Sequence, residues 1–448
     1  MEKRYSRRNF LKQNSVAGLG ILAAGSLHGC TGEKRSPEDT RENDIKIGNI
    51  AGMNLEQLLN NYRTELFDNF IPNMDNYAID HEHGGVMCSL DVRSGEPANT
   101  NKTAWFVGRG LWLYSFLYNN IEKNDRFLEI AKKSKDLLLK LQPGDDSFWP
   151  RTFSREGVPL SGPGDIYGSL FVAEGLAEYA KATGEMSYRE LAKKILFDCV
   201  SRYDRSDYIY NIIYLPDPPQ IQGTRVLGHW MIFLSICTQM LRNGPDDDLE
   251  RLAARSVDAI MNYHVNPAHG LSIEFINHDL SIPDNEIAQL SIIGHGLETF
   301  AFIMFEAARR EDADLFHKAQ AMFKKHVDVA RDALYGGYFH TLRHVDDFTW
   351  DTRKSLWCQQ EVLNGTLFLI EHTGDEWAHR NFARTDAYIH KMFFNPSNKF
   401  WYSSGDRQMA NPSTGLLEHY HHGRQLMLGI LSIERMIGRN GKTSGLFA

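Results

Sequence analysis

Two short stretches of this 448-residue chain place side chains capable of acid–base chemistry at helical spacing. In the first, His295 and Glu298 are three residues apart at the start of an apolar run, so both lie on one face of the predicted helix. In the second, His421 and Arg424 have the same spacing at the start of the last apolar run. Two histidines facing each other across a pocket, one of them oriented by a carboxylate, can remove a proton from one face of a carbon and return it to the other. We therefore predict the chemistry of an epimerase.

Helical periodicity recurs in pairs along the chain, and these pairs must position the two histidines. We predict twelve helices, at residues 54–70, 102–121, 124–142, 165–184, 186–203, 222–243, 247–264, 293–310, 312–334, 354–373, 375–395 and 417–438. Short β-like or glycine-rich segments with an aromatic residue separate many of them. Helical hairpins repeated about every 50–60 residues cannot bury their apolar faces alone, so they must stack. A closed ring of six hairpins, the all-α (α/α)6 barrel, fits twelve helices with short β-hairpin-like loops.

The inner helices of this ring are expected to be the more apolar member of each pair. They are residues 102–121, 165–184, 222–243, 293–310, 354–373 and 417–438. Polar and aromatic residues mark their first turns, and they converge on the axis if all six helices start at the same end of the ring. These candidates are Lys102, Trp105, Arg109, Tyr167, His229, His295, Glu298, Trp357, Gln359, Glu361, His421 and Arg424. One such residue is usually a satisfied core group, but six helices with the same feature indicate a site.

Several motifs in this order resemble a known family. They are Asp80 followed by Gly84-Gly85, Lys102-x-x-Trp105-x-x-x-Arg109, Gly294-His295-x-x-Glu298, Lys354-x-x-Trp357-x-Gln359-x-Glu361 and Tyr420-His421-x-x-Arg424. Together they resemble the N-acylglucosamine 2-epimerase family, which includes cellobiose 2-epimerases and mannose isomerases. The resemblance covers about residues 55–440. It implies an (α/α)6 barrel, a small-molecule carbohydrate as substrate, no metal and no redox cofactor.

The resemblance implies a role for each matching residue. His295 and His421 are similar to the acid/base pair that works at C2 of an open-chain sugar, and Arg109 to the arginine that binds O1 and O2. Glu298 resembles the carboxylate that orients its histidine, and Glu361 a pocket glutamate that holds a hydroxyl group or a neighbouring histidine. Physical chemistry supports the arginine independently, because the enediolate formed by removing a proton next to a carbonyl needs a cation at its oxygen. The expected substrate-binding residues are Lys102, Trp105, Tyr167, Trp357, Gln359, Glu361 and Arg424.

Two departures from the family pattern affect this interpretation. His229 is similar to a third histidine, associated with ring opening. The family usually carries a glutamate three residues later, where this chain has Ile232, so the protonation state and role of His229 stay open. Leu356 stands where a tryptophan is common, which weakens any inference about sugar stacking at that wall.

The N-terminal segment predicts export. Residues 6–12, SRRNFLK, match a twin-arginine signal, and the apolar run that follows is too short to span a bilayer. The sequence Leu27-His28-Gly29-Cys30 resembles a bacterial lipobox, which predicts lipid modification of Cys30. We expect residues 1–29 to be the signal peptide, 30–50 a polar tether and 51–448 the catalytic domain. The mature protein would be periplasmic and held at a membrane by its lipid.

Charge and cysteine usage exclude other classes of protein. Removing residues 1–29 removes five basic residues and one acidic residue, so the formal net charge changes from −8 to −12. Such an acidic chain is not expected to bind nucleic acid. The cysteines after Cys30 have no metal-binding spacing and are expected to pack in the core. The sequence leaves the oligomeric state open, with a dimer as one option.

Four alternatives to an epimerase stay open. The same residues can serve an aldose–ketose isomerase, which moves the proton between C1 and C2. On the same barrel, Glu298 and Glu361 could be the carboxylate pair of a glycoside hydrolase, and Arg109 with Arg424 could neutralise a uronate in a polysaccharide lyase. A non-catalytic sugar-binding lipoprotein would need the tryptophans but neither histidine.

Overall fold

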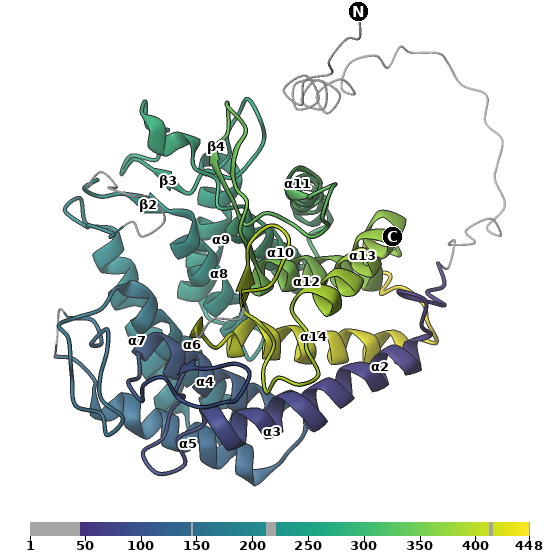
Figure 1. Ribbon diagram of the computed structural model, residues 1–448. Coiled ribbons are helices and arrows are strands. Elements are labelled where there is room, and N and C mark those ends of the chain that lie inside the picture. The colour runs from purple at the N-terminus through teal and green to yellow at the C-terminus, as the bar shows by residue number, and fades with distance from the viewer. Residues whose placement is uncertain (1–44, 145–146, 212–220, 412–414, 448) are drawn as a thin grey trace, which may run out of the picture.

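The structure is a computed structural model, and it describes residues 45–144, 147–211, 221–411 and 415–447. Figure 1 shows these residues as one body of packed helices. The predicted signal peptide, Cys30 and most of the predicted tether lie outside the described residues. Within the described part, we find no helix long and apolar enough to cross a membrane.

In the described part of the chain, twelve long helices form two concentric sets. The outer set is α2 (Leu55–Thr64), α5 (Asp125–Lys140), α7 (Met186–Tyr203), α9 (Asp247–Asp258), α11 (Ala313–Ala330) and α13 (Glu376–Met392). The inner set is α4 (Ala104–Phe116), α6 (Ile166–Thr183), α8 (Leu227–Leu241), α10 (Ile293–Arg310), α12 (Leu356–Thr373) and α14 (His419–Gly438). Each inner helix packs against the next, and α14 packs against α4, so the ring is closed (Figure 1). The predicted (α/α)6 barrel is confirmed.

Short irregular helical segments extend several of these helices. They are η1 (Glu65–Phe70), α3 (Ile71–Asn73) and η2 (Met74–Ala78) after α2, η3 (Leu117–Ile121) after α4, η4 (Ala259–Tyr263) after α9, and η5 (Glu286–Gln289) before α10. The first helix therefore continues to Ala78, beyond the predicted end at residue 70. Pro72 lies at the second position of α3, where its missing N–H costs little, so the sequence contains no stop signal there.

The two sets of helices differ in how much of their surface they bury. In α6, fourteen residues between Ile166 and Ala180 are buried, because the helix has neighbours on all sides. In α9, by contrast, only one stripe is buried, with Leu249, Leu252, Ala253 and Ser256 turned inward. The more apolar member of each hairpin is therefore the inner one, as predicted.

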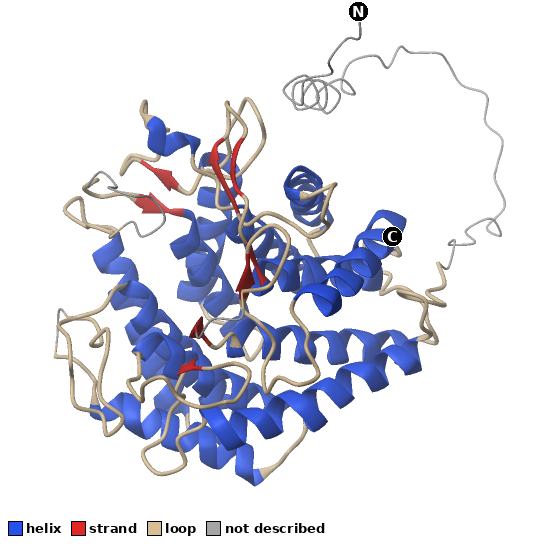
Figure 2. Cartoon of the chain, in the orientation of Figure 1, coloured by secondary structure: helices blue, strands red, loops and turns tan. Residues whose placement is uncertain are grey.

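Eight short strands join the loops that precede the inner helices (Figure 2). The antiparallel pairs are β1 (Ser89–Leu90) with β8 (Gly415–Leu416), β2 (Arg225–Val226) with β3 (Phe275–Ile276), β4 (Thr341–His344) with β5 (Thr349–Asp351), and β6 (Lys354–Ser355) with β7 (Ser404–Gly405). Strand pairing explains one difference from the predicted boundaries. The helix predicted from residue 222 begins at Leu227, because β2 pairs with β3 just before it.

The two ends of the barrel are distinct. The first turns of the inner helices meet one another, as in the contact of Trp357 on α12 with His421 on α14, so all six helices start at one end. The described chain begins at the other end, just past the end of α14. There, Ile47 donates a backbone hydrogen bond to Gly441 (2.6 Å), and Thr443 donates one to Ile45 (3.3 Å).

Candidate active site

The candidate active site lies where the six inner helices begin. Five of them place one residue in the first turn and a second residue four positions later, one helical turn deeper on the same face. The pairs are Trp105 and Arg109, Tyr167 and Phe171, Gly294 and Glu298, Trp357 and Glu361, and Tyr420 and Arg424. Aromatic rings and a glycine therefore surround the mouth, and four charged groups and the Phe171 ring line the level beneath it. Of the predicted residues, the structure brings Arg109, His295, Glu298, Glu361, His421 and Arg424 together here, with Trp105, Tyr167 and Trp357 around them.

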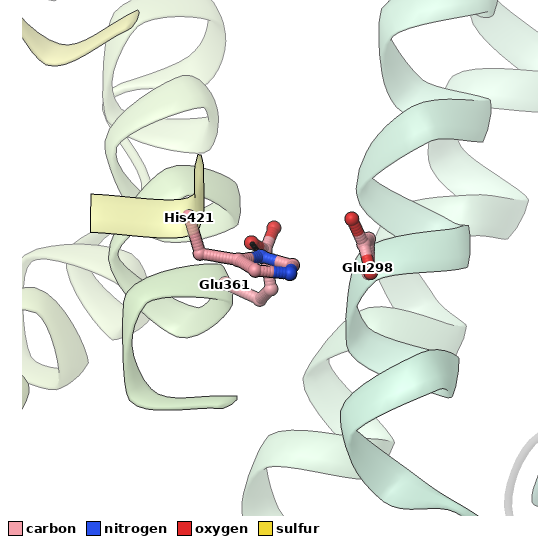
Figure 3. A group of neighbouring side chains, drawn as sticks. All are labelled: Glu298, Glu361 and His421. Atoms are coloured by element: carbon pink, nitrogen blue, oxygen red, sulfur yellow. Dashed lines mark hydrogen bonds and ion pairs between the residues drawn. The ribbon is translucent and has the colours of Figure 1, made fainter. Parts of the chain in front are cut away.

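His421 is held by a carboxylate from the neighbouring helix. Its Nδ1 lies 2.8 Å from Glu361 Oε1, and Figure 3 shows the two side chains together, with Glu298 facing them from α10. Nδ1 donates this bond when it carries the proton, which leaves the Nε2 lone pair free to accept one. Burial lowers the pKa of His421 well below its usual value, although Glu298 opposes the shift. His421 is therefore neutral at pH 7 and suited to act as a base.

His295 has the opposite electrostatic setting. Its Nδ1 lies 3.0 Å from Glu274 Oε1, and the Glu274 carboxylate is fully buried. Burial alone would lower the pKa of His295, but the charge and hydrogen bond of Glu274 raise it above its ordinary value. His295 therefore keeps its proton to higher pH than an ordinary histidine, which suits a proton donor.

Glu298 does not orient His295, contrary to the prediction. Although it lies three residues later on α10, Glu298 points one turn deeper, where its Oε1 accepts a hydrogen bond from Arg424 Nη2 (2.6 Å). Glu274 takes the orienting position instead. It precedes β3, and sequence periodicity gives no sign that this segment lies beside the start of α10.

Arg424 joins the two carboxylates at the deeper level. Its Nη2 donates to Glu298 Oε1 and to Glu361 Oε1 (2.5 Å). The ligand atoms of Glu298, Glu361 and His421 all lie within 4.8 Å of one another, a geometry compatible with a metal ion. The guanidinium already supplies a positive charge to both carboxylates, so this cluster is explained as an ion-pair network. Because both carboxylates share one cation, neither resembles the isolated protonated acid that a hydrolase needs.

Arg109 is held by aromatic rings. Its guanidinium carbon lies 4.2 Å from the ring centroid of Phe171, 4.4 Å from that of Tyr420 and 5.3 Å from that of Trp105. Among the described residues, no carboxylate lies within ion-pair distance of this guanidinium, and its Nε has no hydrogen-bond partner. Cation–π contacts fix the group without using its N–H donors. These donors are thus available to an anionic oxygen in the pocket.

His229 lies deep beside this site. It is fully buried, and the rings of Tyr167 and Tyr210 lie 4.8 and 4.9 Å from its own. Neither ring nitrogen has a hydrogen-bond partner among the described residues. Burial lowers the pKa of His229 well below its usual value, so it is neutral. Ile232, which is also buried, provides no carboxylate, and a role in ring opening stays a prediction.

Two predicted substrate-binding residues have structural roles instead. The ammonium group of Lys102 is fully buried and donates to Asp80 Oδ2 (2.7 Å), the Gly84 carbonyl (2.6 Å) and the Arg155 carbonyl (2.8 Å). All three of its donors are used, because Lys102 precedes the helix and does not share its inward face. The side chain of Gln359 bonds to the backbone N–H and carbonyl of Tyr338 (2.8 and 2.9 Å). Both residues hold loops in place.

Sequence reasoning missed two further carboxyl groups near the site. Glu418 caps α14 by accepting from the backbone N–H of His421 (3.2 Å), and burial raises its pKa to about 7 although Arg109 opposes this. Glu174 accepts from the Tyr420 hydroxyl (2.9 Å), and burial raises its pKa to about 7 as well. Glu418 could have been recognised as a helix cap, whereas Glu174 lies inside an apolar helix with no distinguishing spacing.

Comparison with known proteins identifies related sequences. The profile of the N-acylglucosamine 2-epimerase (GlcNAc 2-epimerase) family matches residues 84–423. The N-acylglucosamine 2-epimerase of Mus musculus is 24% identical over 344 residues, which cover 73% of this chain and 79% of the relative. The cellobiose 2-epimerase of Bacteroides fragilis is 22% identical over 400 residues, which cover 82% and 97%.

Solved structures show the same fold. A sugar epimerase from a ruminal bacterium superposes with a TM-score of 0.71 at 17% identity, over 84% of this chain and 98% of the other. A D-mannose isomerase superposes with a TM-score of 0.68 at 14% identity, over 85% and 97%. At these identities the likeness concerns the fold alone.

Proposed function

Because this chain belongs to the N-acylglucosamine 2-epimerase family, we propose that it inverts C2 of a reducing sugar through two histidines. The observation that carries the proposal is that the imidazole rings of both histidines pack against the indole ring of Trp357. The ring centroids of His421 and His295 lie 5.2 and 5.9 Å from that of Trp357. Their surroundings shift the two pKa values in opposite directions, as expected when one group takes a proton and the other gives one.

In the proposed reaction, neutral His421 takes the proton from C2 of the open-chain aldose. The C2–H electron pair forms a C1–C2 double bond, and the carbonyl π pair moves to O1, giving an enediolate. Arg109 donates to this oxygen while its charge develops, which we expect to contribute about 10²–10³-fold to the rate. Protonated His295 then gives a proton to the opposite face of C2, and the O1 electron pair reforms the carbonyl. One proton is lost and one gained, so the step needs no redox cofactor.

The protonation states of the two histidines after one turnover predict that hydrogen from the solvent enters the product. After one inversion, His421 carries the substrate proton and His295 has lost its own. Exchange with water restores both groups before the next turnover. In D2O, the product should therefore carry deuterium at C2.

A cavity beside the acid/base pair supports a substrate longer than one sugar. It has a volume of about 540 Å³ and is lined on one side by Trp357. Its polar lining includes His340, Asp351, Asp406 and Asn411. Hydrogen-bonding groups around an aromatic ring are the usual composition of a carbohydrate site. We infer that the sugar at the histidines is the reducing end of an oligosaccharide.

Export and lipid anchoring are part of the same proposal. The twin-arginine sequence and Cys30 support a periplasmic enzyme attached to a membrane. An enzyme outside the cytoplasm meets sugars released during glycan breakdown, which agrees with an oligosaccharide substrate.

Aldose–ketose isomerisation is the second candidate function. The fold is shared with a D-mannose isomerase and also with a family 76 glycoside hydrolase, so it does not choose between these reactions. The histidine pair beside Trp357 favours isomerisation over hydrolysis. In that reaction, the enediolate would be protonated at C1 instead of C2, and the same histidines could act.

Proton NMR of the purified protein in D2O, with a panel of reducing mono- and disaccharides, tests the proposal. Loss of the C2 proton signal together with a new anomeric signal from the C2 epimer would support it. Replacing His421 by Asn, or His295 by Asn, should slow exchange about 10²–10⁴-fold. A ketose signal would identify an isomerase. Chain shortening without C2 exchange would rule out both and point to Glu298 and Glu361 as the pair to test.

A further inference from the structure

The chain contains two copies of one buried ion-pair arrangement, which we call the loop clamps. In the first clamp, Lys102 Nζ lies 2.7 Å from Asp80 Oδ2, and the partners are 22 residues apart. In the second, Lys354 Nζ lies 3.0 Å from Asp332 Oδ2, again 22 residues apart. Each ammonium group also donates to a glycine carbonyl 18 residues before it, at Gly84 (2.6 Å) or Gly336 (2.5 Å).

An arginine completes each clamp from a loop on the other side. Arg155 Nε donates to Asp80 Oδ2 and Arg407 Nε to Asp332 Oδ2, both at 2.8 Å and both across 75 residues. The carbonyl of the same arginine accepts from the lysine, 53 residues away in each copy (2.8 and 3.1 Å). These hydrogen bonds hold the pKa of each aspartate far below its usual range against the effect of burial. Each clamp thus ties three segments to one buried carboxylate.

The turn itself does not require the clamp. A third copy of the turn precedes α10, where Asn266 N donates to the Leu271 carbonyl (2.7 Å) and Gly270 N to the Asn266 carbonyl (2.6 Å). It has an asparagine in place of the aspartate, and the helix that follows has Gly294 in its first turn, where α4 and α12 have tryptophan. A further copy, from Asp91 to Glu96, has an aspartate paired with the neighbouring Arg93 but no buried lysine. Among the described residues, the buried lysine accompanies this turn at Asp80 and Asp332, the two copies whose lysine directly precedes a helix with tryptophan in its first turn.

The lysine of each clamp lies three residues before one of these tryptophans. Lys354 precedes Trp357, whose ring lies against His340, His295 and His421, with centroid distances of 5.0, 5.9 and 5.2 Å. Lys102 precedes Trp105, whose ring centroid lies 4.8 Å from that of Tyr167 and 5.3 Å from the Arg109 guanidinium carbon. One tryptophan therefore borders the acid/base pair, and the other borders the cation.

We propose that the two clamps are positioning groups for separate halves of the site. The Asp332–Lys354–Arg407 clamp holds Trp357 against the acid/base histidines, and the Asp80–Lys102–Arg155 clamp holds Trp105 against Arg109. This inference rests on the proposed function, because it assigns each clamp to one step of the proton transfer. Neither set of clamp residues touches the reacting atoms.

The two halves should respond differently when their clamps are loosened. Loosening Trp357 admits water to His421, whose low pKa results mainly from burial. Its pKa would then rise toward the ordinary value, and the base would become protonated at mildly acidic pH. The titratable and charged groups that face His421 are Glu298, Glu361, Glu418, Arg109, Arg424 and His295, and none of them belongs to the clamp. Loosening Trp105 should instead weaken the positioning of Arg109, which carries its charge throughout this pH range.

Arg407→Gln and Arg155→Gln form a matched pair of variants. Both arginines are about one-third exposed, at 39% and 34%, and both make two bonds to a buried aspartate. The measurement is kcat for C2 exchange at about pH 5.5 relative to about pH 7.5, together with Tm. We expect this ratio to fall by up to about tenfold in Arg407→Gln, as for a base whose pKa returns to about 6.5. In Arg155→Gln, we expect kcat/KM to fall. The ratio of kcat at about pH 5.5 to kcat at about pH 7.5 should stay equal to that of the parent protein.

The outcomes separate the possible failures. If both variants keep the parent's ratio, or both change it equally, the clamps are structural only and the inference is wrong. If the parent protein exchanges no C2 proton with any sugar, the proposed function fails first. Should Arg407→Gln not fold, Arg407→Lys keeps the charge but loses the paired geometry, and a smaller fall in the same ratio is expected.

Discussion

Glu274 and Glu361 each accept a hydrogen bond at the Nδ1 side of one histidine, yet the two imidazoles have opposite pKa shifts. Burial lowers the pKa of both histidines, but at His295 the charge and hydrogen bond of Glu274 outweigh it, whereas at His421 burial dominates and nearby positive charges add to it. Glu361 is shared with Arg424, whose positive charge lowers the pKa of His421, whereas Glu274 is not shared with an arginine among the described residues. Two similar carboxylate–histidine contacts can therefore produce one base and one acid.

Replacing Glu274 with Gln tests the acid at this scale. His295 is protonated below its raised pKa and loses its proton as the pH rises through that value. Without the carboxylate charge the pKa falls, so the alkaline limb of the kcat profile should move to lower pH, and kcat at neutral pH should fall about tenfold or more. Glu286→Gln, which removes a highly exposed carboxylate, is the control. An unchanged alkaline limb in Glu274→Gln would exclude His295 as the proton donor.

Replacing Arg109 with Met tests the oxyanion contact. The substitution keeps most of the apolar contact with Phe171 and Tyr420 but removes the charge. We expect kcat to fall about 10²–10³-fold. Arg255→Met removes another arginine stacked on an indole, 5.0 Å from the Trp230 centroid and outside the site, and should affect Tm alone. Equal loss of kcat in both variants would show that the effect is structural.

At the scale of the elements, close packing at the start of α10 fixes the position of Trp357. A Cβ atom on Gly294 would lie 2.4 Å from the Trp357 ring, which is too close for any carbon pair. The Tyr167 hydroxyl approaches Gly228 on α8 in the same way, at 2.2 Å from a hypothetical Cβ. Glycine at these two positions therefore lets aromatic side chains lie directly against the neighbouring helix.

Gly294→Ala should separate activity from stability. Alanine normally stabilises a helix by about 0.5–1 kcal/mol over glycine, but here the Trp357 ring must shift away from α10, which disturbs its packing against the histidines. We expect C2 exchange to fall at least about tenfold, by analogy with the effect of misplaced groups, and Tm not to rise. Gly438→Ala, with no heavy atom within 4 Å of its Cβ, should leave exchange unchanged. Wild-type exchange in Gly294→Ala would contradict the role of Trp357.

The elements were largely predictable from sequence, whereas one key contact of the site was not. Periodicity predicted α7 and α10 with their observed bounds, because the apolar spacing runs over the whole of each helix. The i, i+3 rule correctly placed Glu298 on the same face of α10 as His295. It did not show that the Glu298 side chain lies one helical turn deeper, where it contacts Arg424. Glu274 escaped prediction because it reaches His295 through a tertiary contact, its backbone hydrogen bond to Leu290 just before α10 (3.2 Å), which local spacing does not encode.

At the scale of the whole molecule, the ring arrangement determines which way the site faces. The histidines lie at the start of the inner helices. The described chain begins at the other end, where Ile47 and Ile45 pair with the residues that follow α14. If Cys30 carries a lipid, the barrel is attached by the end opposite its active site. The residues between Cys30 and Ile45 can span at most about 50 Å, so the attached end would stay within that distance of the membrane, and we expect the mouth to face away from it.

This orientation predicts that lipid anchoring leaves access to soluble sugars unchanged. Export through the twin-arginine signal should be lost in Arg7→Lys/Arg8→Lys, and Cys30→Ala should move the protein from the membrane fraction to the soluble periplasmic fraction. Anchored protein in vesicles and the released Cys30→Ala protein should then have equal kcat/KM on a reducing disaccharide, because the substrate reaches the mouth from the solvent side in both. A lower kcat/KM only in the anchored form, relieved when the tether is lengthened, would show that the mouth faces the membrane.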